Sequence, residues 1–140
     1  MNVNEWVKRC HEIAVAHGWW DEEESIGQII ALMHAELSEA LEQARDGRPG
    51  VYHPCNAGGI CVEDVEDMRI SCASRVYKAA DPEAQCTAKS PKPEGIYVEL
   101  VDCVIRIFDY LGREGADVEA ILAEKCAYNE TRPYRHGKKF

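Results

Sequence analysis

The sequence predicts an all-α protein: a bundle of four helices with an irregular insertion between the second and the third helix. Apolar residues recur at helical spacing in four separate segments of the 140-residue chain. Alternating runs of β-branched residues, which would indicate strands, are absent from the sequence. Proline and glycine gather in one stretch, from about 48 to 94. Because this length is typical of one domain, we expect residues 1–140 to form a single domain that contains this insertion.

The first two helices have clear sequence boundaries. We predict the first helix from about Asn4 to Ala16, ended by Gly18. Its inward face is expected to hold Trp6, Cys10, Ile13, Ala14 and His17. Ser25 followed by Gln28 is the pattern of a capping box, so the second helix should begin there and run to about Arg45.

The third and fourth helices follow the insertion. The third should run from Gly95 or Ile96 to Leu111, and it is apolar nearly all round, which predicts a buried helix. Its polar residues form one stripe: Glu99, Asp102, Arg106 and Asp109. The fourth helix should start near Asp117, an N-cap candidate, and continue to about Glu130 before Pro133.

The insertion itself allows two further interpretations. A short helix there could be supported by Val62, Val65, Ile70, Ala73 and Val76. A structural zinc ion could in principle be held by His53, Cys55, Cys61, Cys72 and Cys86, but paired Cys-x-x-Cys knuckles are missing. The acids of Glu63–Asp67 are contiguous and interrupt no apolar stripe, so we interpret them as the solvated start of a helix.

Composition and charge narrow the class of partner. The net charge of −9 argues against a general nucleic-acid binder. The last ten residues hold four cations and no acid, so the rest of the chain carries −13. No apolar run approaches the length of a membrane span, and the charged N-terminal segment does not resemble a signal peptide. Seven cysteines, an odd count, then indicate reduced thiols and a cytoplasmic location.

Two acid pairs are the most informative feature of the chain. Glu36 and Glu39 lie three residues apart in the second helix, as do Glu99 and Asp102 in the third. Residues three apart share one helix face, and both pairs interrupt apolar stripes. Packing the two helices together would gather four carboxylates, which repel one another unless a cation lies between them. Oxygen-only ligands predict Mg²⁺, or Mn²⁺ in its place.

A set of polar residues near the C-terminus complements the acids. Lys125, Asn129 and Arg132 share one side of the fourth helix and its exit. Each cation alone is also what the negative end of the helix dipole favours. Beside a metal cluster, however, Lys and Arg are typical phosphate ligands. We predict a phosphate clamp here, with the tail residue Arg135 folding back toward the same ligand.

These residues resemble a known family. The resemblance lies in the segments from His34 to Glu42, from Gly95 to Ile107 and from Lys125 to Gly137, with their E-x-x-E, E-x-x-D and K-x-x-x-N-x-x-R patterns. They are similar to MazG-like proteins, all-α nucleoside triphosphate pyrophosphohydrolases related to dimeric dUTPases and dCTP pyrophosphatases. The resemblance covers the chain except the insertion, where small members have a short loop.

The resemblance implies an enzyme that hydrolyses a nucleoside triphosphate to the monophosphate and pyrophosphate, in nucleotide-pool house-cleaning. It implies metal ligation by Glu36, Glu39, Glu99 and Asp102, and phosphate binding by Lys125, Asn129 and Arg132. We assign the general base to Glu39, because it lies toward the edge of the apolar stripe. We expect the base of the nucleotide to stack on Trp19, Trp20 or Trp6, and we take Trp20 as the site residue. A homodimer or dimer of dimers should cover the remaining apolar surface. The alternative is a non-catalytic helical protein that binds a metal or nucleotide or serves as a scaffold.

Overall fold

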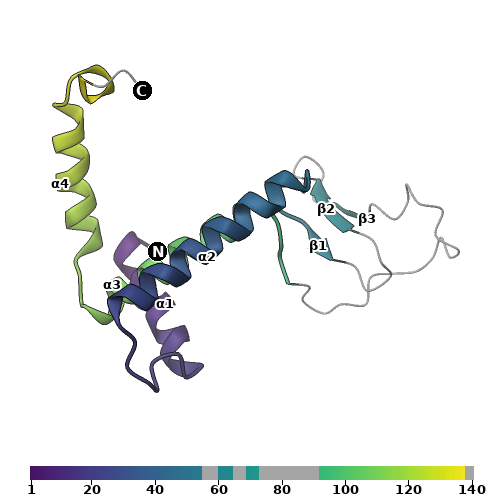
Figure 1. Ribbon diagram of the computed structural model, residues 1–140, viewed down its shortest axis with the longest axis horizontal. Helices are drawn as coiled ribbons and strands as arrows, with labels where there is room; N and C mark the ends of the chain where they lie inside the picture. The colour runs from purple at the N-terminus through teal and green to yellow at the C-terminus, as the bar shows by residue number, and fades with distance from the viewer. Residues whose placement is uncertain (55–59, 65–68, 73–91, 138–140) are drawn as a thin grey trace, which may run out of the picture. The chain divides into compact units, whose positions relative to one another are not determined.

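The computed structural model describes residues 1–54, 60–64, 69–72 and 92–137, and within them it contains four α-helices (Figure 1). These are α1 (Val3–Ala16), α2 (Ile26–Arg45), α3 (Ile96–Arg113) and α4 (Val118–Glu130). A short 3₁₀ helix, η2 (Tyr134–Gly137), follows α4. The predicted all-α class with four helices is confirmed, and the predicted helix ends agree with the observed ones to within about two residues.

The described part of the insertion contains three short strands. They are β1 (His53–Pro54), β2 (Ile60–Asp64) and β3 (Arg69–Cys72), paired antiparallel in the order β1-β2-β3. The short helix expected in this segment is therefore not formed where Val62 and Ile70 lie, since both are in strands. The helix start expected at Glu63 and Asp64 is not formed either, because both residues belong to β2. β-Branched residues favour the extended backbone. The other three residues of that expectation, Val65, Ala73 and Val76, lie outside the described residues.

Two helix starts have the caps that the sequence predicts. The Ser25 backbone N–H donates to Gln28 Oε1 (2.9 Å), and the Gln28 N–H donates back to Ser25 Oγ (3.3 Å). This is the reciprocal capping box that begins α2. At α4, Asp117 accepts a hydrogen bond from the Ala120 N–H at 3.0 Å. A second capping box, which was not predicted from the sequence, joins Asn2 and Glu5 at the start of α1.

The chain forms two compact units. Unit 1 comprises Met1–Ile29 and Ile105–Phe140, and unit 2 comprises Ile30–Val104. In unit 1, α1 approaches the end of α3 at Gly112, where an added Cβ would lie 2.8 Å from His11 Cβ. The same helix is joined to α4 through Asn4, which donates to Asp117 Oδ1 (2.9 Å) and accepts from the Glu119 N–H (3.1 Å). Within unit 1, α1 therefore contacts both the end of α3 and the start of α4.

The inward face of α1 differs from the predicted one. Val7 and Cys10 are its buried residues, whereas Trp6 is 51% exposed and Ile13 is also exposed. His17, too, is exposed, and Ala14 is partly buried. The contact with Gly112 of α3 is made by Val7 and His11, so the buried stripe follows these positions and leaves Trp6 to one side.

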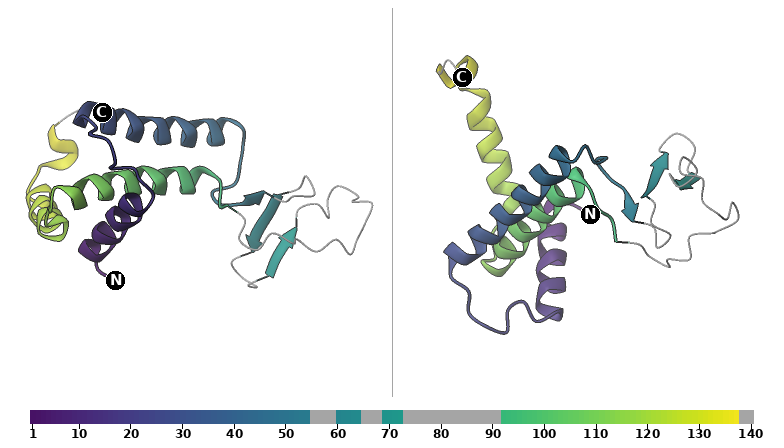
Figure 2. Two further views of the ribbon diagram at one scale, coloured as in Figure 1. Left: turned by 90° about the horizontal axis from the view of Figure 1, so that it is seen from below. Right: turned by 45° about the vertical axis from the view of Figure 1, so that its right-hand side comes forward.

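In unit 2, the part of α2 that belongs to this unit runs antiparallel to the first half of α3, and the two lie side by side (Figures 1 and 2). The two helices are joined at one end by backbone pairing of Tyr52 with Glu94, through hydrogen bonds of 2.8 and 2.9 Å. The Tyr52 ring is buried, and its hydroxyl donates to Gln43 of α2 (3.2 Å). Gly95, at φ +120°, follows this pair and lies against the carbonyl oxygens of Pro49 and Gly50. The start of α3 is therefore held by contacts with the residues that follow α2.

The apolar surface of α3 is less buried than the sequence predicts. Its buried residues are Glu99 and Cys103. Its large apolar residues that remain exposed in the single chain are Tyr97, Leu100, Val101, Val104 and Ile105. The expectation of a helix buried on every side is therefore wrong for the single chain. The polar stripe, in contrast, faces inward at Glu99.

Candidate metal centre

Three of the four predicted acids lie together in unit 2. One carboxylate oxygen each from Glu36, Glu99 and Asp102 lies within 4.8 Å of the others. Glu36 is only 7% exposed and Glu99 only 3% exposed, while Asp102 is partly buried. We call these three residues the acid group. Glu36 comes from α2 and the other two come from the first turns of α3, so the group depends on the packing of these two helices.

Helical periodicity explains why these side chains face one another. On α2, the buried positions are Ile29, Glu36 and Ala40, spaced by seven and four residues, which is one stripe of a helix. On α3, Glu99 and Cys103 are one turn apart, and Asp102 adjoins them. Carboxylates thus occupy positions on the contact stripe where apolar residues are usual.

The electrostatics of the acid group are unfavourable for charge. Burial raises the pKa of Glu99 above its ordinary value, and the charges of Glu39, Asp102 and Glu94 raise it further, while Lys92 opposes them. In the described part of the chain, Lys92 is the one cation among the groups that shift this pKa. Carboxylates held together in this way favour binding of a proton or of a cation.

Glu39 has a different environment from the other predicted ligands. Its side chain is exposed, and it is not a member of the acid group. Its charge nevertheless acts on Glu99, so it lies close enough to influence the site electrostatically. This position at the margin is consistent with the sequence interpretation that Glu39 lies toward the edge of the apolar stripe.

The acid group fits a hard divalent cation. The donors are oxygen atoms from three carboxylates, and no histidine or cysteine among the described residues belongs to the group. Mg²⁺ and Mn²⁺ prefer such donors, whereas zinc sites usually contain nitrogen or sulfur. Glu36, Glu99 and Asp102 would hold the ion, and its charge would offset their repulsion. The His and Cys residues considered for zinc lie outside the described side chains, apart from His53.

The predicted phosphate-binding residues belong to unit 1. Lys125 and Asn129 are exposed on α4, and Arg132 is partly exposed just beyond it. The Lys125 ammonium lies 5.2 Å from the centre of the Tyr128 ring. Arg135, in η2, lies 5.5 Å from the centre of the Tyr134 ring and has a positive φ of 52°. Their role as a phosphate clamp stays a prediction.

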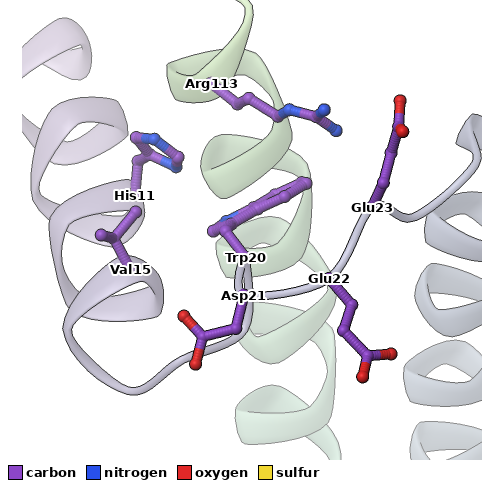
Figure 3. Close-up of a pocket in the computed structure, with 7 residues that line it drawn as sticks. All are labelled: His11, Val15, Trp20, Asp21, Glu22, Glu23 and Arg113. Atoms are coloured by element: carbon purple, nitrogen blue, oxygen red, sulfur yellow. The ribbon is translucent and has the colours of Figure 1, made fainter.

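Trp20 lines a pocket of about 400 Å³ in unit 1 (Figure 3). Its indole N–H donates to Asp109 Oδ1 at 2.8 Å, and the same oxygen lies 2.8 Å from His11 Nδ1. The Arg113 guanidinium lies 4.4 Å from the centre of the Trp20 ring. The pocket is lined by His11, Val15, Trp20, Asp21, Glu22, Glu23 and Arg113. The ring of Trp20 is thus held at its edge and contacted by a cation.

Sequence reasoning missed several of these residues. His11 and Arg113 gave no signal, because nothing in their own helices marks them as partners of Trp20. Asp109 was recognised only as part of the polar stripe of α3. Lys92 was overlooked, because it lies in the proline-containing stretch before α3, where no periodicity applies.

Comparisons with known proteins add no relative. No family model, curated protein or solved structure matches this chain. In the described part of the chain, no helix combines the length and the apolar character that crossing a bilayer requires.

Proposed function

We propose that this protein is a Mg²⁺-dependent nucleoside triphosphate pyrophosphohydrolase of the MazG-like type, active in the cytoplasm in nucleotide-pool house-cleaning. Its reaction would convert a nucleoside or deoxynucleoside triphosphate to the monophosphate and pyrophosphate. The observation that carries the proposal is the acid group, in which two nearly buried carboxylates and a third, partly buried one meet within 4.8 Å. A structural helix pair would gain nothing from such mutual repulsion.

The acid group would bind the cation through Glu36, Glu99 and Asp102. When bound, Mg²⁺ supplies charge that stabilises the phosphate oxygens and orients the substrate. Glu39 is exposed and outside the group, so its carboxylate remains available to accept a proton from the attacking water. Its predicted role as a metal ligand is therefore secondary to its role as a base in this proposal.

The residues proposed to bind phosphate and the nucleotide base belong to unit 1. Lys125, Asn129 and Arg132 would contact phosphate oxygens, with Arg135 added from the tail. Trp20 would stack on the base, using an indole ring whose edge Asp109 holds at 2.8 Å. A homodimer or dimer of dimers would be the working assembly. Neither nucleic acid nor a membrane is part of this proposal.

A second candidate function is binding of the same metal ion without catalysis. The exposed apolar residues on α2, α3 and α4 favour an assembly role, so the protein could be a helical scaffold that binds a metal or a nucleotide. In that case the acid group would stabilise the helix pair when the metal is bound. Binding without product formation would distinguish this scaffold from the enzyme.

The test is product analysis across canonical and damaged nucleoside triphosphates in the presence of Mg²⁺. The proposal expects monophosphate and pyrophosphate in equal amounts, abolished by chelation and by Glu99→Gln. Glu42→Gln, which removes an exposed acid from the same helix as Glu36, is the matched control and should keep activity. Release of a diphosphate and inorganic phosphate, or binding with no turnover of any nucleotide, would contradict the proposal.

A further inference from the structure

Lys92 is a cation beside the acid group that the predicted phosphate clamp does not include. Its ammonium lies 3.0 Å from Glu94 Oε1, and its side chain is 71% exposed. Lys92 and Glu94 are two residues apart in the segment just before α3, and their side chains form an ion pair. The pair therefore lies directly ahead of the helix that carries Glu99 and Asp102.

The position of Glu94 is fixed by the backbone. Its N–H donates to the Tyr52 carbonyl (2.9 Å), and its carbonyl accepts from the Tyr52 N–H (2.8 Å). Gly95 then allows α3 to begin, and the Glu99 N–H donates to the Gly95 carbonyl at 3.1 Å. Glu99 thus lies in the first turn after this anchored pair. The Lys92 side chain, in contrast, is long and mostly in solvent, so it can change partner without any change in the backbone.

The charges of this segment act on one another. The hydrogen bond to Glu94 raises the pKa of Lys92, and the negative charges of Glu99 and Asp102 add to that effect. Lys92 in turn opposes the rise in the pKa of Glu99. A cation whose charge acts on a metal-binding carboxylate group would repel the metal ion if the metal were the complete ligand. It is favourable if the bound ligand also carries negative charge.

We propose that Lys92 is an anion-binding residue of the acid group and that it contacts a phosphate group of the ligand bound there. Glu94 holds the ammonium next to the site while the ligand is absent, and the phosphate replaces Glu94 as its partner on binding. The inference rests on the proposed function only in taking phosphate as the anion. It gives unit 2 a phosphate contact of its own, in addition to the residues predicted on α4.

Two binding measurements test the proposal on the full chain without any turnover. The first is calorimetric titration with inorganic tripolyphosphate in excess Mg²⁺. The second is Mn²⁺ binding alone, followed by electron paramagnetic resonance. Lys92→Met should bind tripolyphosphate roughly ten-fold more weakly, the scale of a lost hydrogen bond to a charged group. Its Mn²⁺ affinity should be equal to or higher than that of the wild type, because a nearby cation is gone.

Two more variants separate a binding role from a structural one. Glu94→Gln should bind tripolyphosphate more tightly, because it removes a competing partner of Lys92 and a like charge, while its backbone pairing with Tyr52 persists. If the Lys92–Glu94 pair only stabilised the fold, Glu94→Gln would weaken binding as Lys92→Met does. Arg48→Met removes an exposed cation from the same unit and should change the affinity by less than about two-fold.

The outcomes also separate this inference from the proposed function. If the wild type binds Mn²⁺ and tripolyphosphate but Lys92→Met behaves like Arg48→Met, the inference is overturned and the proposed function stands. The inference is also overturned if Lys92→Met loses Mn²⁺ affinity together with tripolyphosphate affinity. If the wild type binds no Mn²⁺, the acid group is not a metal site, and both the proposed function and the role of Lys92 are refuted.

Discussion

At the level of single residues, the proposed function depends on the acid group. Its members occupy the contact stripes of two helices, where apolar side chains would pack with no electrostatic cost. In the metal-free protein each charge raises the free energy of the others. The site is thus a balance between fold stability, which favours fewer charges, and cation binding, which favours more.

We expect Glu36→Gln, Glu99→Gln and Asp102→Asn each to lower kcat by at least about two orders of magnitude, the scale lost with one key electrostatic contact. The thermal midpoint of the metal-free protein should stay the same or rise, because each change relieves repulsion. Steady-state kinetics and thermal unfolding after chelation measure the two effects. Full activity in these three variants would show that the acids are not the functional centre.

At the scale of elements, the start of α3 depends on Gly95. At φ +120° a side chain is strained, and an added Cβ would lie 2.6 Å from the Pro49 carbonyl oxygen. Gly95→Ala should therefore lower the free energy of unfolding by more than about 2 kcal/mol and weaken Mn²⁺ binding by displacing Glu99. Gly115→Ala is the matched control, since it has a positive φ of 65° with no atom within 4 Å of its Cβ. It should cost about 1 kcal/mol and leave Mn²⁺ binding intact.

The N-cap of α4 predicts a dependence of stability on pH. The hydrogen bond from Asn4 lowers the pKa of Asp117 below its ordinary value of 3.8, and that from the Ala120 N–H lowers it further. A lowered pKa means that the unfolded chain binds the proton more tightly. The stability from Asp117 is therefore fully present above pH 3.8 and is lost as pH falls through the folded-state pKa. Asp117→Asn should show a smaller loss of thermal midpoint than the wild type over this acid range, and Asp117→Ala should be less stable at neutral pH.

Local patterns determined which parts of the structure could be predicted. The cap at Ser25, the N-cap at Asp117 and the acids on the stripes of α2 and α3 follow from spacing within one helix, which the sequence displays directly. The triple contact of Asp109, His11 and Trp20 joins residues about 90 positions apart, so no local pattern reveals it. The inward face of α1 was misassigned for the same reason, because the approach of Gly112 decides it.

At the scale of the whole molecule, exposed apolar residues predict self-association. Large apolar side chains remain exposed on α2, α3 and α4 in the single chain, among them Leu41, Val101 and Ile121. Monomeric proteins rarely leave such surface uncovered. We expect a homodimer or a dimer of dimers at micromolar concentration, measured by light scattering. A stable species of 15.7 kDa would contradict this, and Val101→Lys should favour smaller species in a protein that does associate.

The distribution of charge predicts a role for the tail. Four cations lie in the last ten residues, on a remainder of net charge −13. Truncation after Pro133 should raise KM more than it lowers kcat, because the tail would contribute binding equally to the ground state and the transition state. The KM of the wild type should also rise with added salt. An unchanged KM after truncation would show that the tail does not bind substrate and serves only as a solubilising end.

The pairing of Tyr52 with Glu94 has a consequence for how this chain can vary. The backbone leaves the helical part of unit 2 at Tyr52 and returns to it at Glu94, and these two residues are hydrogen-bonded neighbours. Neighbouring antiparallel residues can be joined by a two-residue turn. A change in the number of residues between Tyr52 and Glu94 would leave both members of this hydrogen-bonded pair in place. The register of α2 against α3 would then be inherited unchanged.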